Sequence, residues 1–180
     1  MIHAKTSLVS GFIALLLGAL PGFASDTPAT SGTWQLIPVP GTNNLSSVGW
    51  YRAWVKVPDS FFTTHERNLF EESVGVYIRD LRGAHEVWMN GSRLGTGGAF
   101  PPDYRDGGET LHRHKVPVGT LRKGQWNEIA IRVYRPPTER AASPGGFLGT
   151  APFIMDYFLE CVFEGAWEFR PGEDYSPNGA

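Results

Sequence analysis

The segment 96–108 brings together side chains that could hold a polyhydroxylated ligand. It contains two aromatic residues, Phe100 and Tyr104, beside one carboxylate, Asp103, and one guanidinium, Arg105. An aromatic ring can stack on the C–H face of a pyranose, and carboxylate and guanidinium groups can bond to its hydroxyls. Long loops carried by rigid elements are common places for such sites. This segment is therefore the first candidate for ligand binding.

A second candidate is the run from Trp50 to Lys56. Alternate residues of a strand share one face, so Trp50, Arg52 and Trp54 would point the same way. The two indoles would then lie about 13 Å apart, with the guanidinium between them. This face could stack on a sugar ring. A structural cation–π stack, covered by a loop or a neighbouring domain, explains the same pattern at least as well.

No pattern in the chain predicts catalysis. Hydrolysis of a glycosidic bond usually uses two carboxylates that flank the bond. Glu71 and Glu72 are adjacent and would point to opposite faces of a strand, and Asp103 and Asp106 have no evident buried partner. The sequence also contains no Gly-x-Ser-x-Gly segment to carry a nucleophilic serine. We therefore expect no catalytic activity from this chain alone.

Two patterns could bind a metal, and neither is complete. His112 and His114 would share a strand face, which suits two ligands, but no third ligand is close in the sequence. Asp103, Asp106 and Glu109 could contribute to a structural calcium site, although a solvated acidic loop is the simpler interpretation. No cofactor is expected, and structural calcium stays open as the alternative.

The elements that must position these residues are short β-strands. Aromatic residues make up 13% of the chain, and 22 glycines and 14 prolines are spread along it, a composition typical of sandwiches and barrels. Asn90-Gly91 predicts a tight hairpin. Ile129, Ile131 and Val133 alternate with more polar residues and should face a core, as should Val76. Strands are expected at Thr33–Val39, Val48–Val57, Ser73–Leu81, His85–Asn90, Ser92–Gly95, Leu111–Val116, Asn127–Arg135 and Met155–Phe163. The prediction is an all-β, two-sheet antiparallel sandwich.

Four segments, in order and with matching spacing, resemble the sugar-binding domain of glycoside hydrolase family 2. They are Gly49-Trp50-Tyr51-Arg52 with Val57-Pro58, Glu86–Gly91 with Leu94-Gly95, Leu121–Val133, and Gly145-Gly146-Phe147. They correspond to the family's "GWYR…VP" strand, "VWVNG…VG" hairpin, "LKxGxNxIAVRV" strand and Gly-Gly-Ile turn. The loop from Gly97 to Tyr104 is more similar to the same domain in sialate O-acetylesterase-like proteins. The resemblance covers about Trp34 to Asp156.

This resemblance implies a galactose-binding-like jelly roll that accompanies a catalytic domain. In family 2 enzymes the catalytic carboxylates lie in a separate barrel, and in the esterases the serine lies in a separate α/β domain. The resemblance therefore implies a glycan ligand and docking to catalytic hydrolase domains as the two kinds of partner. In family 2 galactosidases the stretch after the hairpin supplies an aspartate to the sugar site, and Asp103 is its nearest counterpart.

The two ends of the chain carry different signals. Residues 1–24 predict a signal peptide, because a weakly basic start precedes the apolar run Leu8–Leu20 and a small-residue cleavage site at Ala24. The expected protein is exported, periplasmic or extracellular, with no membrane span after cleavage. Residues 25–32 predict a polar flexible leader, and 33–163 the sandwich. The tail 164–180 resembles the opening of a further module, with a last strand and a loose end as the alternative.

Charge and cysteine content exclude other classes. The net charge is −2 with scattered lysines and arginines, so no nucleic-acid groove is expected. Cys161 is the single cysteine and should be a buried, inert thiol. Three hypotheses remain: a carbohydrate-recognition or accessory module, the N-terminal fragment of a multidomain glycoside hydrolase or carbohydrate esterase, and a structural docking domain without a sugar ligand.

Overall fold

The protein is built almost entirely of antiparallel β-strands. The computed structural model describes residues 34–43, 45, 47–62, 74–108, 110–139, 144–156 and 159–177. The strands in this part of the chain are β1 (Gln35–Val39), β2 (Gly41–Asn43), β3 (Ser47–Val55), β4 (Gly75–Ile78), β5 (Leu81–Arg82), β6 (Ala84–Met89), β7 (Ser92–Gly97), β8 (His112–Lys115), β9 (Asn127–Arg135), β10 (Gly145–Phe147), β11 (Phe153–Met155), β12 (Glu160–Val162) and β13 (Gly165–Pro171). A 3-10 turn, η1 (Pro137–Glu139), and a short helix at 59–62 complete them.

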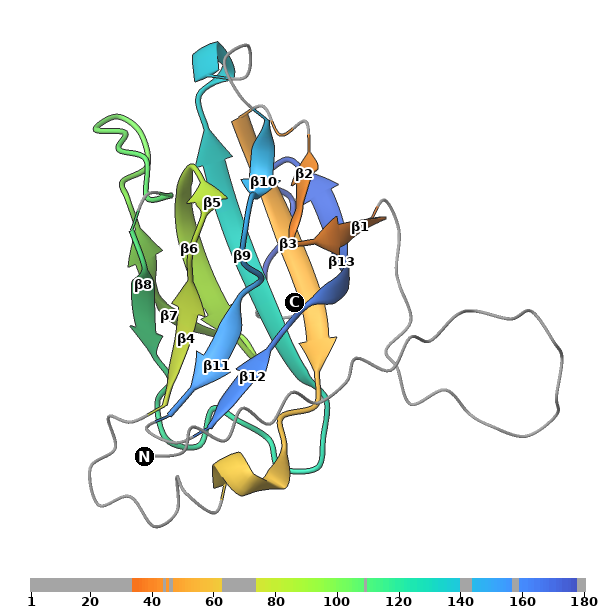
Figure 1. Cartoon of the computed structure of the whole chain (residues 1–180). Coiled ribbons are helices and arrows are strands. Elements are labelled where there is room, and N and C mark those ends of the chain that lie inside the picture. Colours follow the sequence, from red (N-terminus) through yellow and green to blue (C-terminus); the bar gives the residue numbers. More distant parts are fainter. Residues whose placement is uncertain are drawn as a thin grey trace, which may run out of the picture.

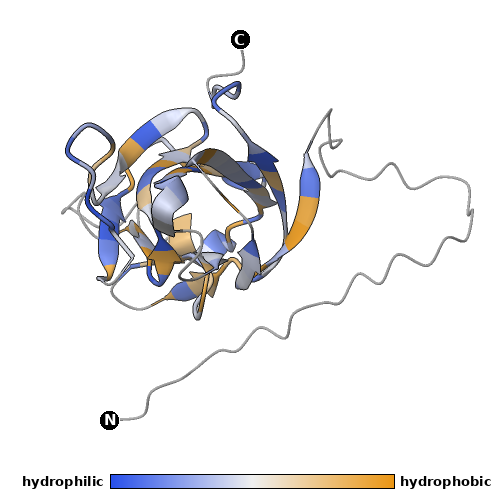
Figure 2. Cartoon of the chain, turned by 90° about the horizontal axis from the view of Figure 1, so that it is seen from above, coloured by the Kyte–Doolittle hydropathy of each residue, from blue (hydrophilic) through white to orange (hydrophobic). Residues whose placement is uncertain are grey.

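The strands form two layers around one core. A six-stranded sheet in the order β1-β13-β3-β9-β6-β7 makes one layer. The other layer consists of a four-stranded sheet, β12-β11-β4-β8, and a three-stranded sheet, β2-β10-β5, which lie over the first in Figure 1. Figure 2 shows the strands from above, with hydrophobic and hydrophilic segments alternating along them. The predicted all-β antiparallel sandwich is confirmed, with the second layer split into two sheets.

The alternation in β9 decides which side of the large sheet faces the core. Ile129, Ile131 and Val133 are each 0% exposed, as is Val76 on the opposite layer, so these predicted core residues are confirmed. On β3 the inward positions are Tyr51 and Ala53. The residues between them, such as Arg52 on β3, point to the other side of the sheet. The six-stranded sheet therefore has an apolar inner face and an outer face rich in tryptophan and charge.

Two strand predictions are wrong in detail. Met155–Phe163 is not one strand but the hairpin of β11 and β12. The chain reverses because the Asp156 carboxylate accepts a hydrogen bond from the Leu159 amide at 2.7 Å. Ser73–Leu81 likewise divides into β4 and β5, since Asp80 adopts a left-handed backbone conformation (φ 57°).

The sandwich does not end at Phe163, where the sequence placed its boundary. β13 lies inside the six-stranded sheet, paired with β1 on one side and β3 on the other. Its Trp167 and Phe169 belong to the hydrophobic core. The segment resembling a module opening is thus a strand of this domain, and the sandwich extends through Pro171. Residues 1–24 and 25–32 lie outside the described residues, as does the pair Glu71 and Glu72.

Within the described ranges, no helix has the length and apolar character needed to cross a membrane.

Candidate functional site

A pocket opens at one end of the outer face of the six-stranded sheet. Its volume is about 430 Å³, and it is lined by Trp54, Asn90, Gly91, Ser92, Arg122, Trp126, Glu128 and Pro177. Two indole rings, one guanidinium and one carboxylate thus meet in one concave place. Of the ligand-binding residues predicted from the sequence, only Trp54 lines this pocket. This pocket is the candidate functional site.

The rim of the pocket is fixed by two amide side chains, the half-buried Asn90 and the buried Asn127. Asn90, at the turn between β6 and β7, donates to Asn127 Oδ1 at 2.8 Å and to the Thr120 carbonyl at 2.7 Å. Its own Oδ1 accepts the Glu128 amide at 2.9 Å. Asn127 is 0% exposed and ties down the loop before β9 through the amide and carbonyl of Arg122. Because these bonds hold both the turn and the loop against β9, the pocket is formed before any ligand arrives.

The hairpin turn needs its particular residues. Asn90 and Gly91 both have positive φ, 48° and 81°. These values suit a tight two-residue turn between antiparallel strands. The predicted Asn90-Gly91 hairpin is therefore confirmed, and it forms one wall of the pocket.

Cationic groups accompany both indole rings. The Arg52 guanidinium lies 4.3 Å from the centroid of Trp54, and the Lys56 ammonium lies 4.9 Å from that of Trp126. These cation–π contacts orient the rings. The Trp126 indole Nε1 is buried without a hydrogen-bond partner among the described residues.

Trp50 is not an open stacking surface. Its side chain is only 4% exposed and packs with Trp34 and Ala130 in a small second cluster on the outer face. Arg52 lies between Trp34 and Trp54, at 4.1 and 4.3 Å from the two ring centroids. It forms a buried ion pair with Glu168 on β13, with Arg52 Nη2 at 2.6 Å from Glu168 Oε2. A structural cation–π stack is thus present, but its two rings are Trp34 and Trp54 and not Trp50 and Trp54 as the sequence suggested.

The loop 96–108 lies toward the other end of the same face. Glu128 and Tyr134 mark the two ends along β9, roughly 20 Å apart at the rise of a strand. Phe100 and Tyr104 both pack on Tyr134, with centroids at 6.2 and 5.5 Å. Asp103 and Arg105 are exposed. Arg105 exchanges two backbone hydrogen bonds with Ala99, both at 3.0 Å, so the loop is folded on itself.

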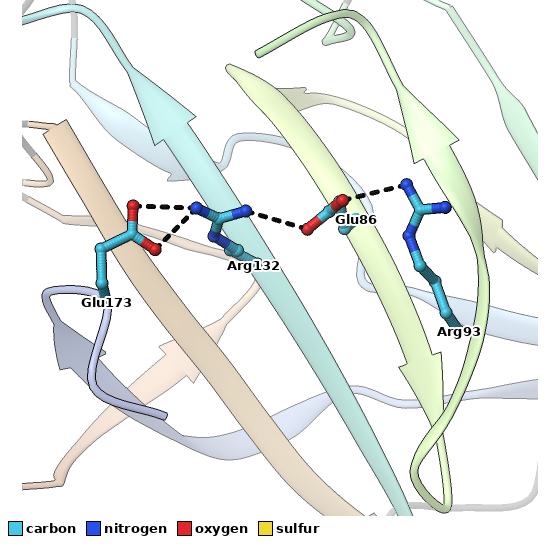
Figure 3. Close-up of polar contacts among 4 residues, drawn as sticks. All are labelled: Glu86, Arg93, Arg132 and Glu173. Carbon is cyan, nitrogen blue, oxygen red and sulfur yellow. Dashed lines mark hydrogen bonds and ion pairs between the residues drawn. The ribbon is translucent and has the colours of Figure 1, made fainter. Parts of the chain in front are cut away.

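A row of charged side chains lies on the face between the loop and the pocket. Glu173, Arg132, Glu86 and Arg93 alternate in sign across the strands (Figure 3). Arg132 contacts both Glu173 oxygens, at 2.6 and 2.8 Å, and Glu86 at 3.1 Å. Glu86 in turn accepts from Arg93 at 2.9 Å. Arg132 also lies 4.8 Å from the centroid of Phe100, so the row connects the loop to the segment after β13.

The histidines of β8 gain a third neighbour that the sequence did not predict. His85 on β6 lies with its ring centroid 5.1 Å from His112 and 5.6 Å from His114. Burial, with help from the neighbouring imidazoles, lowers the pKa of His85 to about 3 and that of His114 to about 4. In the described part of the chain, no three His, Cys, Asp or Glu side chains are placed to hold a metal ion.

The acidic loop considered for calcium is divided by the structure. Asp106 Oδ1 accepts the amides of Gly83 and Gly108, at 2.9 and 2.7 Å, so this carboxylate fixes the loop to β6. Asp103 is exposed, and Glu109 lies outside the described residues. Cys161 on β12 is half-buried, and burial raises the pKa of its thiol, which keeps it in the unreactive protonated form.

Sequence reasoning missed Arg122, Trp126 and Glu128 as site residues. Trp126 stands just before the predicted strand Asn127–Arg135, where the sequence gives it no role in a site. The alternation places Glu128 on the face opposite the core-facing Ile129, but it does not mark Glu128 as a binding residue. No signal in the sequence indicates that the loop before β9 lies beside the turn after β6 and the strand end at Trp54.

Comparisons with known proteins give little beyond the fold. No protein-family model and no curated protein sequence matches the chain. Two solved structures of Bacteroides uniformis beta-glucuronidase are similar to this chain. One of them is beta-glucuronidase 2 covalently bound to cyclophellitol-6-carboxylate aziridine. Each has 17% sequence identity and a TM-score of 0.45, and the match covers 83% of this chain. The chain spans 16% of the length of those enzymes. Neither is a sialate O-acetylesterase.

Proposed function

We propose that this chain is a non-catalytic carbohydrate-recognition module of the kind that accompanies glycan-hydrolysing enzymes, and that it binds its glycan in the pocket at Trp54 and Trp126. The observation that carries the proposal is the set of groups in this pocket. Indole faces suit the C–H surface of a pyranose, while Arg122 and Glu128 can donate to and accept from its hydroxyls.

The rigidity of the pocket supports binding. The Asn90 and Asn127 network is complete without a ligand, so little ordering is needed when a sugar enters.

The composition of the pocket favours binding over hydrolysis. Of the residues that line it, only Glu128 carries a carboxylate, whereas glycoside hydrolysis usually uses two. The association with a glycan-cleaving enzyme rests on the four sequence segments that resemble the sugar-binding domain of glycoside hydrolase family 2. Export to the periplasm or the outside of the cell belongs to the same proposal, since the glycans that such modules meet lie there.

The pocket is preferred to the loop 96–108 because of what the aromatic rings contact. Phe100 and Tyr104 both pack on Tyr134. The loop thus uses its rings to hold its own shape. Trp54 and Trp126 instead line an open volume.

An NMR titration of the mature chain with lactose, cellobiose and xylobiose tests the proposal. We expect the indole and amide signals of Trp126 and Trp54 to shift, with a Kd between about 1 mM and 1 µM, as shallow sites with few contacts give. Trp126→Ala should weaken binding by about tenfold or more, because it removes a stacking surface worth roughly 1.5–3 kcal/mol.

Asp103→Ala is the matched control and should change the affinity less than about twofold, since exposed residues outside a binding site contribute little. Thermal melts of both variants separate lost binding from lost folding. Shifts confined to Phe100, Asp103 and Tyr104 would move the site to the loop. No shift with any of the sugars would favour a docking domain without a glycan ligand.

A further inference from the structure

The segment 172–177, which we name the strap, crosses the outer face of the six-stranded sheet next to the pocket. It leaves β13 through a hydrogen bond from the Gly172 amide to the Val48 carbonyl, at 2.9 Å. Glu173 then binds Arg132, as Figure 3 shows, and Asp174 lies 3.5 Å from Arg170. Pro177 forms part of the pocket wall. The strap and the pocket are therefore contiguous.

Tyr175 of the strap fills an aromatic cradle on this face, formed by Trp34, Trp50, Arg52 and Glu128. Its ring centroid lies 5.0 Å from that of Trp34 and 5.1 Å from that of Trp50, nearly perpendicular to both. The Arg52 guanidinium lies 5.3 Å from its centroid. The Tyr175 hydroxyl donates to Glu128, and burial together with this carboxylate raises the pKa of the phenol.

The cradle offers the kinds of group that bind a pyranose: two indole rings, a guanidinium and a carboxylate that accepts a hydroxyl proton. Tyr175 meets both indoles edge-on, with interplanar angles of 89° and 80°. Glu128 takes part in both places, because it accepts from Tyr175 and also lines the pocket. A glycan that extends from the pocket would reach the cradle at this residue.

The cradle contains donors that Tyr175 does not satisfy. The Nε1 groups of Trp50 and of Trp88, which packs against the same cluster, are buried without a hydrogen-bond partner in the described part of the chain. An unmade hydrogen bond in a buried place is costly, and buried donors usually have partners. The hydroxyls of a sugar could accept from these indoles, whereas the hydrocarbon edge of a phenol ring cannot.

The two ion pairs of the strap involve exposed acidic side chains. Glu173 and Asp174 are 57% and 82% exposed at their side chains. Ion pairs with such exposure contribute little to stability and are screened by salt. The strap is held mainly by the ring and hydroxyl of Tyr175, the two features that a sugar ring would replace.

We propose that the cradle is a second pyranose subsite, continuous with the pocket, and that Tyr175 occupies it until a longer β-linked glycan displaces the strap. This inference rests on the proposed function of the pocket. With this arrangement the protein distinguishes glycans by their length, because a disaccharide fills only the pocket and a longer glycan also enters the cradle. The closed strap lowers the affinity only for ligands that must open it.

Calorimetric titration of the full chain with cellobiose and cellopentaose tests this inference. In Tyr175→Ala, the affinity for cellopentaose should rise by about fivefold or more, because the cost of opening the strap is removed. The affinity for cellobiose should not rise with it, since a disaccharide binds in the pocket and does not need the cradle to open. The indole N–H signals of Trp50 and Trp88 should shift with cellopentaose and not with cellobiose.

Two further variants keep the result interpretable. Tyr175→Phe retains the ring and frees Glu128, so it should fold like the wild type and give a smaller gain with cellopentaose. Tyr134→Ala removes another tyrosine of the outer face and should leave both affinities unchanged. Cellobiose binding that is retained, without a gain for cellopentaose in Tyr175→Ala and Tyr175→Phe, overturns the subsite alone. Loss of all glycan binding in the wild type overturns the proposed function as well.

Discussion

The two faces of the six-stranded sheet are built from the same strands but are covered by different kinds of residue. The inner face is mainly apolar, and Val87, Met89 and Ile131 are 0% exposed. Its buried polar side chains, His85, Asn127 and Arg135, lie toward the ends of β6 and β9. The outer face is also largely covered, but by tryptophans, a buried ion pair and a strap from the end of the domain. A sheet needs one buried face to be stable, and the second face of an antiparallel sheet is commonly solvated. The aromatic outer face is therefore the unusual one, and it is where the pocket lies.

The largest effect should come from breaking the ion pair on the outer face. Glu168→Ala would leave the Arg52 guanidinium buried without its carboxylate, which should lower the free energy of unfolding by about 3–5 kcal/mol. Chemical denaturation measures this. The double variant Arg52→Met with Glu168→Leu should recover most of the loss, because it removes both charges. A loss below about 1 kcal/mol in Glu168→Ala would mean that the outer face is as solvated as an ordinary sheet surface.

The next prediction compares the loss of stability for substitutions of two neighbouring residues on opposite faces of β9. Ile131→Ala should lower the free energy of unfolding by about 2–5 kcal/mol, because it leaves a cavity in the core. Arg132→Ala, one residue along, should cost about 0–1 kcal/mol, since its ion pairs are partly exposed. Urea midpoints of the two variants give the difference. Equal losses would contradict the assignment of an apolar inner face and a partly solvated outer row.

The third prediction concerns the buried histidines between β6 and β8. His85 and His114 are neutral in the folded state, with pKa values lowered to about 3 and about 4, whereas the unfolded chain binds protons below the ordinary value of 6.5. Stability should therefore be fully present above pH 6.5 and fall as the pH drops. The loss should be about 2 kcal/mol per histidine by pH 5.

Denaturation curves at pH 7.5 and 5 measure this slope, and the range stays above the titration of ordinary carboxyls. In His114→Gln the dependence should become shallower. A free energy of unfolding that is flat over this range would show that these imidazoles are not buried as described.

Sequence and structure agree best where the pattern is local. The alternation in Asn127–Arg135 and the positive-φ turn at Asn90-Gly91 were predicted in place, because strand periodicity and turn chemistry act between near neighbours. The predictions that failed also have a physical cause. The sequence left open whether the segment of β13 is a last strand or the start of another module, because nothing local reveals that it pairs with β1 and β3, which lie more than a hundred residues earlier.

The sequence by itself determined the fold class, the core faces of β3 and β9 and the aromatic character of the surface opposite. Only the tertiary structure decided which aromatic residues line a pocket. Trp54, Arg122 and Trp126 come from two separate segments, and their meeting depends on the pairing of β3 with β9 and on the buried Asn127. Tyr175 shows the same principle, since a residue that reads as a loose end fills the centre of the outer face. Long-range pairing, which no local spacing encodes, builds this site.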